Sequence, residues 1–165
     1  MINNVELNNI EKTKKYIQEN ISNGLTRLNA HLDWIDGTYN KVTINGFVPL
    51  EIDEPIEFGG KNLAPNPVEY ILTGAVGCFA ISFEIFASEQ GIILEKVSID
   101  IDANVNLAVF LGLTEGEKGI LNPVIKMKVS SSESLEEIQK IANKALLSSI
   151  VLNSLKASVE LVVEK

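Results

Sequence analysis

Residues 53–91, DEPIEFGGKNLAPNPVEYILTGAVGCFAISFEIFASEQG, decide the fold of this chain. Asn66, Pro67 and Glu69 have the spacing of a helix start. Asparagine suits the N-cap, proline suits the first helical position, and a glutamate three residues after the cap can reach back to it as in a capping box. No strong helix breaker follows until Gly91, which suits a helix end. The stretch therefore predicts one long helix.

This helix is apolar on nearly every side between Ile71 and Phe83, which is typical of a helix buried inside a protein. Glutamates bracket the run, and it is shorter than the roughly 18 apolar residues that a membrane span requires. We therefore expect a core helix and no membrane partner. Gly74, Cys78 and Ser82 form one stripe of small residues along it, so another element can approach the backbone there with the thiol in the contact.

Length and composition limit the classes of function. A chain of 165 residues is expected to form one domain with a sizeable core. The formal net charge is −8 and Arg27 is the only arginine, which argues against a nucleic-acid partner. One cysteine excludes an internal disulfide and fits a reducing cytoplasm, and the N-terminus lacks the apolar run of a signal peptide. We expect a cytoplasmic protein.

Turn signals and hydrophobic periodicity predict an α+β fold, with a helical extension over residues 1–24 and the main domain over residues 25–165. Asp-Gly and Asn-Gly pairs indicate hairpins in the first half. The predicted strands are residues 25–35, 38–44, 47–52, 95–107, 124–129 and 158–163. A second amphipathic helix is expected after Ser132 or Ser134, followed by a short helical turn, and residues 108–122 are expected to be a connection.

The segment from Asp53 to Cys78 resembles the signature of the OsmC/Ohr superfamily of osmotically inducible and organic-hydroperoxide-resistance proteins. The shared features are acidic residues before a proline, the Gly-Gly pair, the N-P-x-E helix start, and a cysteine eleven residues after that proline. NVNLAVFLGL and ALLSSIVLNSL resemble later segments of the family. The resemblance covers residues 30–163.

The resemblance implies antiparallel sheets wrapped around two central helices in an intertwined homodimer, with the active sites at the dimer interface. In the family's peroxidases, a thiolate on the central helix attacks a peroxide oxygen. A second, late cysteine then forms a disulfide that a dithiol reductant reopens. A glutamate at the helix start and an arginine in the N-terminal sheet position and activate the thiolate.

This chain departs from that pattern in three ways. Ser149 occupies the position of the second cysteine, Val68 stands where the peroxidases carry their glutamate, and Arg27 lies upstream of the expected arginine. The chain is therefore similar to a single-cysteine, OsmC-like branch. Ser149 is interpreted as a vestige of the second cysteine.

Cys78 is the candidate nucleophile, with Glu69 from a partner chain as a polar orienter. Glu69 lies on the opposite helix face because nine residues correspond to about 900° of rotation, and a plain capping role competes with catalysis. A free cysteine on an apolar helix is usually a small buried hydrophobe. Cys78 also lies about three turns into its helix, too far for the N-terminal dipole to act, and no nearby donor or cation is evident from its neighbours.

Two functions remain open at this point. The first is thiol-dependent reduction of organic hydroperoxides by Cys78, with an external thiol as reductant. The alternative is a non-catalytic protein that binds a small apolar ligand at the dimer interface, in a pocket lined by apolar side chains: Phe79, Phe83, Phe110 and Leu111.

The remaining polar residues favour neither a cofactor nor a metal. His31 and Glu84 are interpreted as ordinary polar residues, and no His/Cys cluster suggests a metal site. The Gly59-Gly60 pair predicts a turn, because no phosphate-binding loop follows it.

Overall fold

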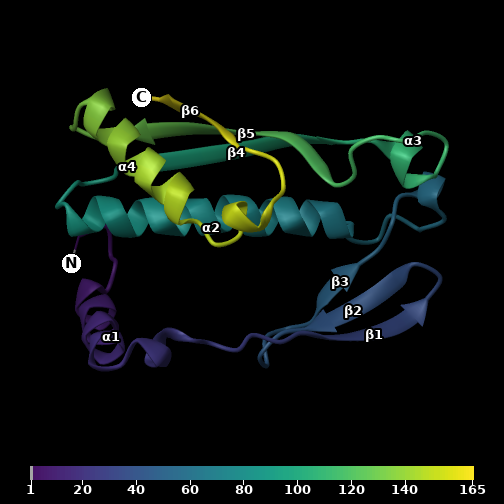
Figure 1. The fold of residues 1–165 in the computed structure, drawn as a ribbon, viewed down its shortest axis with the longest axis horizontal. Coiled ribbons are helices and arrows are strands. Elements are labelled where there is room, and N and C mark those ends of the chain that lie inside the picture. Colours follow the sequence, from purple (N-terminus) through teal and green to yellow (C-terminus); the bar gives the residue numbers. More distant parts are fainter. Residues whose placement is uncertain (1) are drawn as a thin grey trace. The chain divides into compact units, whose positions relative to one another are not determined.

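The computed structural model describes residues 2–165, which divide into two units: Glu11–Ile71, and residues 2–10 with Leu72–Lys165 (Figure 1). The first unit contains most of helix α1 (Leu7–Glu19) and a sheet of three antiparallel strands in the order β1-β2-β3. Its strands are β1 (His31–Asp36), β2 (Tyr39–Thr43) and β3 (Leu50–Ile52).

The second unit holds a second three-stranded sheet, in the order β4-β5-β6, and the longer helices. Most of the long helix α2 (Pro67–Glu89) belongs to it, since its first turn lies in the first unit. The other elements are β4 (Lys96–Val105), α3 (Leu107–Phe110), β5 (Ile120–Ser130), α4 (Leu135–Ser148) and β6 (Glu160–Glu164). Short 3-10 helices occupy Ile21–Gly24, Ile56–Phe58 and Leu152–Ser154.

The predicted capping box at the start of α2 is confirmed. The Glu69 backbone N–H donates to Asn66 Oδ1 at 2.9 Å, and the Asn66 N–H donates to Glu69 Oε2 at 2.8 Å. At the other end Gly91 adopts a φ of 78°, the left-handed conformation expected after a helix C-terminus. The two ends of α2 are therefore set by local sequence.

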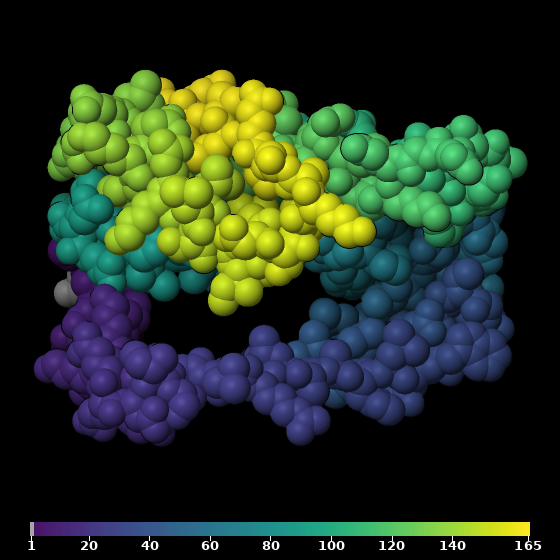
Figure 2. Space-filling model, in the orientation of Figure 1, coloured from purple at the N-terminus to yellow at the C-terminus, as the bar shows by residue number. Residues whose placement is uncertain are grey.

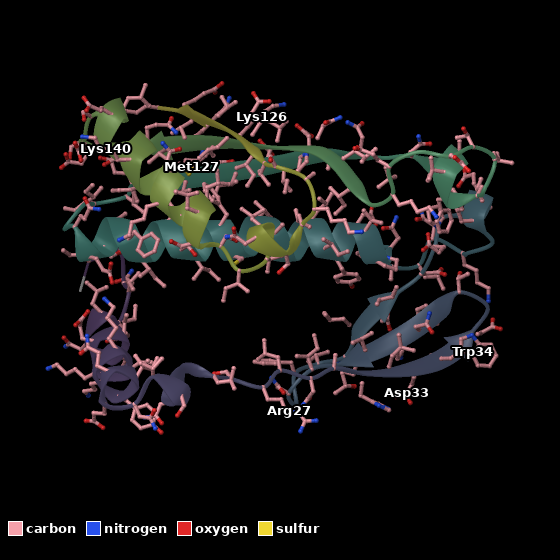
Figure 3. The ribbon with its side chains drawn as sticks, in the orientation of Figure 1. Arg27, Asp33, Trp34, Lys126, Met127 and Lys140 are labelled. Atoms are coloured by element: carbon pink, nitrogen blue, oxygen red, sulfur yellow. The ribbon has the colours of Figure 1, made fainter. Side chains whose placement is uncertain are left out.

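One face of α2 makes the core of the second unit. Ala75, Phe79, Phe83 and Ala87 follow a four-residue spacing and are fully buried. They join the inward side chains of β5 and the apolar face of α4 in one cluster, so both helices pack on the same face of the sheet. Lys126 and Met127 show the strand alternation in Figure 3: Met127 is buried and Lys126 is exposed on the opposite face.

The expectation of purely antiparallel sheets is wrong for the last strand. β4 and β5 are antiparallel, but β6 pairs with β5 in parallel. The chain leaves the end of β5 and passes through α4 before it returns to the same sheet. A crossover through a helix delivers the next strand in parallel orientation.

Two predicted element boundaries also differ from the structure. β1 begins at His31, whereas residues 25–30 were expected to be part of a strand. A short helix, α3, occupies the start of the predicted connection, because Asn106 caps it by accepting from the Val109 N–H at 3.3 Å. Asn-capped single turns give little periodicity to detect in a sequence.

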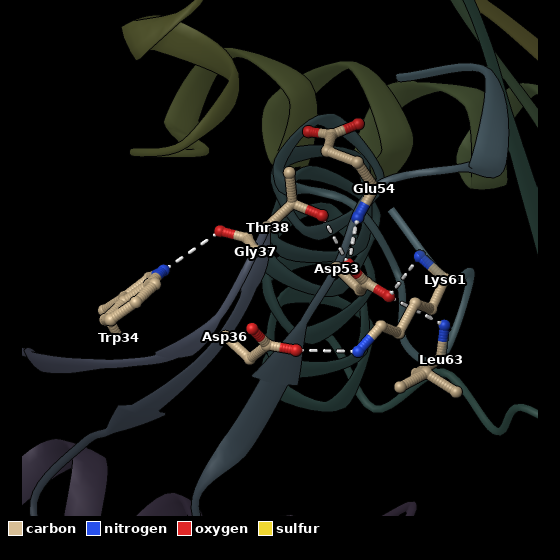
Figure 4. A network of polar contacts seen from close by, with 8 residues as sticks. All are labelled: Trp34, Asp36, Gly37, Thr38, Asp53, Glu54, Lys61 and Leu63. Carbon is tan, nitrogen blue, oxygen red and sulfur yellow. Dashed lines mark hydrogen bonds and ion pairs between the residues drawn. The ribbon is translucent and has the colours of Figure 1, made fainter. Parts of the chain in front are cut away.

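A buried carboxylate organises the loop that precedes α2. Asp53 is 1% exposed and accepts from the Thr38 hydroxyl at 2.7 Å (Figure 4). It also accepts from three backbone N–H groups, those of Glu54, Lys61 and Leu63, at 2.9–3.1 Å. These four donors hold the pKa of Asp53 at about 2, with the Thr38 hydroxyl as the largest cause and burial acting in the opposite direction.

The N-terminal segment is fastened to the end of α2 by Asn3. Its side-chain amide donates to Ser88 Oγ at 3.0 Å and to the Ile92 carbonyl at 2.8 Å, and its oxygen accepts from the Leu94 N–H at 2.9 Å. The start of the chain is thereby a fixed part of the second unit. The predicted domain boundary at residue 24 stays a prediction.

Candidate thiol site

Cys78 lies midway along α2, on the flank between the buried face and the exposed face of the helix. Its side chain is partly exposed, and Ser82 Oγ donates to its backbone carbonyl at 2.8 Å. Phe79 and Ala75, on the adjacent face, are fully buried. The sulfur atom is therefore at the edge of the core, with access from outside the subunit.

The turn that follows α4 packs against the small-residue stripe of α2. Ser149 is the C-cap of α4 and is fully buried. A Cβ atom added to Gly74 would lie 4.0 Å from Val151 Cγ1, an ordinary packing distance. The expected close approach at the stripe is thus confirmed, and Figure 2 shows the yellow-green surface of α4 and this turn in front of the teal α2.

Three hydrogen-bond donors from this turn reach the thiol. Burial raises the pKa of Cys78, but the hydroxyl of Ser149 and the backbone N–H groups of Val151 and Ile150 lower it further. The net pKa lies below the ordinary value for cysteine. Hydrogen bonds to the charged form favour that form, so this arrangement stabilises a thiolate.

Ser149 is itself held in place by neighbouring groups. Its Oγ accepts from the Leu152 N–H at 3.3 Å. Its carbonyl accepts from the Asn153 N–H at 3.0 Å and from Asn153 Nδ2 at 2.7 Å. With an acceptor position of Oγ occupied by an N–H group, the hydroxyl proton is directed to the sulfur.

Exposed apolar side chains surround the access to the sulfur. Ile150, whose N–H contacts the thiol, is 79% exposed, and Leu147 on the last turn of α4 is 77% exposed. Ile81 is 59% exposed and lies one turn along α2 from Cys78, on an adjacent face. The entrance to the thiol therefore suits an apolar molecule or an apolar protein surface.

Glu69 and Cys78 are not brought together within α2. They lie nine positions apart on the same helix and therefore on opposite faces. The capping contacts with Asn66 account for the glutamate side chain in the structure. A catalytic role for Glu69 stays a prediction.

The other polar candidates take ordinary positions. His31 is exposed on β1 and its Nε2 lies 3.3 Å from Asp33 Oδ1. Arg27 lies in the exposed segment before β1, labelled in Figure 3 with Asp33. Within residues 2–165, the side chains form no group of three or more His, Cys, Asp or Glu residues that could hold a metal ion.

Two of the four residues expected to line a ligand pocket belong to the core instead. Phe79 and Phe83 are fully buried against β5 and α4. Phe110 and Leu111 are exposed at the end of α3. The expectation of one pocket lined by all four is wrong for the subunit, because the aromatic pair lies on the α2 face that packs on the sheet.

The sequence did not reveal the donors around Cys78, and the interpretation of Ser149 as a vestige is wrong. The donors come from residues far along the chain, which a search of the local neighbours of Cys78 does not reach. The only available signal was the pair of small residues, Gly74 and Ser82, which predicted a close approach but not its occupant.

Comparisons with known proteins place the chain in a family. The sequence model of the family described as OsmC-like protein matches residues 59–164, well over half of the chain. The chain belongs to the OsmC-like family. α2, which is long and apolar enough to cross a bilayer by composition, is accordingly the core helix of a soluble OsmC-like protein.

Solved structures of OsmC-like proteins share its fold. An OsmC-like protein of unknown function from Vibrio cholerae matches with a TM-score of 0.73 and 13% identity, over 84% of this chain and 99% of that one. An OsmC-like protein from Mycoplasma pneumoniae gives 0.72 and 14%, over 84% and 96%. An organic hydroperoxide resistance protein OsmC from Legionella pneumophila, also described as a predicted redox protein, gives 0.61 and 21%, over 86% and 97%. A comparison with curated protein sequences found no match.

Proposed function

We propose that this OsmC-like protein is a single-cysteine thiol peroxidase that reduces organic hydroperoxides through Cys78. The observation that carries the proposal is the convergence of the Ser149 hydroxyl and two backbone N–H groups on a partly exposed thiol, with a pKa below the ordinary value. A thiolate is the nucleophilic form of cysteine. The membership of a single-cysteine branch belongs to the same proposal.

The reaction would proceed in two stages. The Cys78 thiolate attacks the outer peroxide oxygen, so that an S–O bond forms while the O–O bond breaks, and the alkoxide takes a proton to leave as an alcohol. The resulting sulfenic acid reacts with an external thiol to form a mixed disulfide and water. A second thiol attacks the mixed disulfide, which releases a small disulfide and restores the Cys78 thiolate.

An external reductant is required because Cys78 is the only cysteine in the chain. The exposed Ile150, Leu147 and Ile81 favour an apolar substituent on the peroxide over hydrogen peroxide. A thiol-dependent cycle also suits a cytoplasmic location, where low-molecular-weight thiols are kept reduced.

The proposed functional form is a homodimer. The α2 helix leaves Ile81 exposed beside the thiol, and β1 is exposed along its whole length, including Leu32, Trp34 and Ile35. Apolar patches of this kind mark protein–protein interfaces. A second copy of the chain would cover them, and the partner subunit's Glu69 would orient the substrate. Size-exclusion chromatography with light scattering tests the dimer.

The proposed activity is tested by following the loss of cumene hydroperoxide in the presence of a dithiol or a monothiol. The wild-type protein is expected to turn over, and the Cys78→Ser variant is expected to be inactive. A mixed disulfide of the monothiol on Cys78, identified by mass spectrometry, would support the proposed cycle. Equal rates for wild type and Cys78→Ser would reject it.

Non-catalytic binding of a small apolar ligand is less well supported. Phe79 and Phe83 are unavailable for such a pocket because they are buried in the core. Native mass spectrometry of freshly purified protein separates the two functions: a retained ligand together with an inert thiol would favour binding.

A further inference from the structure

The turn formed by Ser149, Ile150 and Val151 makes polar contacts with the thiol that a packing role alone does not require. A serine at a helix C-terminus in a protein core could bond to the preceding turn of its own helix. Ser149 instead accepts from the Leu152 N–H, and its hydroxyl reaches the sulfur on another helix. The buried hydroxyl thus links the two helices through Cys78.

We propose that Ser149 is a positioning residue that keeps Cys78 in its reactive form and orientation. This inference rests on the proposed function, because it explains how the thiol would be activated. The groups that act on Cys78 are a neutral hydroxyl and two neutral amides, Ile150 N–H and Val151 N–H. Activation would therefore come from aligned dipoles instead of an ion pair with a cation.

The packing of the two helices fixes this alignment. Ser149 is fully buried and its carbonyl is held by Asn153 through two hydrogen bonds. Val151 lies against Gly74, one helical turn before Cys78. The donors therefore cannot turn away from the sulfur without disturbing the core, so they are organised before any substrate arrives.

Ser149 would also direct the fate of the oxidised sulfur. A serine hydroxyl cannot form a disulfide with a sulfenic acid, but it can still donate a hydrogen bond to the oxidised group. Oxidised Cys78 would therefore wait for an external thiol at the same position. A cysteine at position 149 would instead be placed to condense with the sulfenic acid, because the Ser149 and Cys78 side chains are in contact.

The experiment compares Ser149→Ala with a matched control, Ser88→Ala. Both serines are buried, and Ser88 donates to the Glu84 carbonyl on α2 without contacting Cys78. The thiolate absorbance at 240 nm is recorded against pH, together with the rate of iodoacetamide alkylation. Circular dichroism confirms that each variant is folded.

Ser149→Ala is expected to raise the Cys78 pKa and to slow alkylation at neutral pH by roughly two- to fivefold, the scale of one lost hydrogen bond. Ser88→Ala is expected to leave both unchanged. An unchanged titration in Ser149→Ala, or equal shifts in both variants, would overturn the proposal. These readouts need no peroxide, so they separate this inference from a failure of the peroxidase function.

Ser149→Cys gives a second test that does not require removal of a side chain. One equivalent of cumene hydroperoxide is expected to produce an intramolecular disulfide between positions 78 and 149. Iodoacetamide followed by mass spectrometry would detect it as the loss of both free thiols. If both thiols stay free while the same protein is oxidised only by an intermolecular route, the proposed contact is wrong.

Discussion

The Ser149 side chain and the Cys78 thiol are in hydrogen-bond contact, although they lie at the end of α4 and in the middle of α2. The contact joins a fully buried hydroxyl to a partly exposed sulfur. It explains how a cysteine three turns into a helix can have a lowered pKa without help from the helix N-terminus.

The approach of the turn to the sulfur depends on the small side chain at position 74. Gly74→Leu is expected to push Val151 away and to raise the Cys78 pKa, because Val151 lies 4.0 Å from where a Cβ would be. Gly74→Ala is the control: it fits at that distance and is expected to stabilise the helix by up to about 1 kcal/mol. Thiolate absorbance against pH measures the effect. Identical titrations for the two variants would show that the turn does not position the donors.

The core face of α2 carries much of the stability of the second unit. Phe83→Ala is expected to lower the free energy of unfolding by about 3–5 kcal/mol, because Phe83 is fully buried and a large cavity would remain. Phe110→Ala is a suitable control, since Phe110 is 74% exposed. Urea denaturation followed by circular dichroism measures both. Equal losses in the two variants would contradict the assignment of the core.

Local signals were enough to predict the helix ends and the membership of the core. Asn66, Glu69 and Gly91 act through neighbours in sequence, so their roles could be predicted. The donors around Cys78 and the parallel pairing of β6 depend on where α4 returns the chain, which no local pattern encodes. The role of Ser149 was missed for the same reason.

The Asp53 carboxylate is expected to stabilise the loop before α2 in a pH-dependent way. Its pKa is about 2 in the folded chain and about 4 when unfolded. Its contribution is therefore fully present above pH ~4 and lost as the pH falls towards 2. Asp53→Asn should lower the melting temperature at pH 7, and the gap to wild type should narrow between pH 4 and pH 2. A gap independent of pH would contradict this role.

The exposed face of α2 provides a direct test of the proposed dimer. Ile81→Lys is expected to raise the dimer dissociation constant by roughly tenfold or more, because a lysine would have to be buried at the interface. The folded subunit should be little affected, since Ile81 is 59% exposed. Ile93→Lys, at a site 64% exposed outside α2, is the comparison. Light scattering that shows unchanged dimers of Ile81→Lys would place the interface elsewhere.

The central claim is that Cys78 is a reactive thiolate, and stopped-flow oxidation by cumene hydroperoxide at neutral pH tests it most directly. The expected result is a second-order rate clearly above that of free cysteine, with sulfenic acid trapped on Cys78. A rate equal to that of free cysteine, with no sulfenic acid at Cys78, would contradict it.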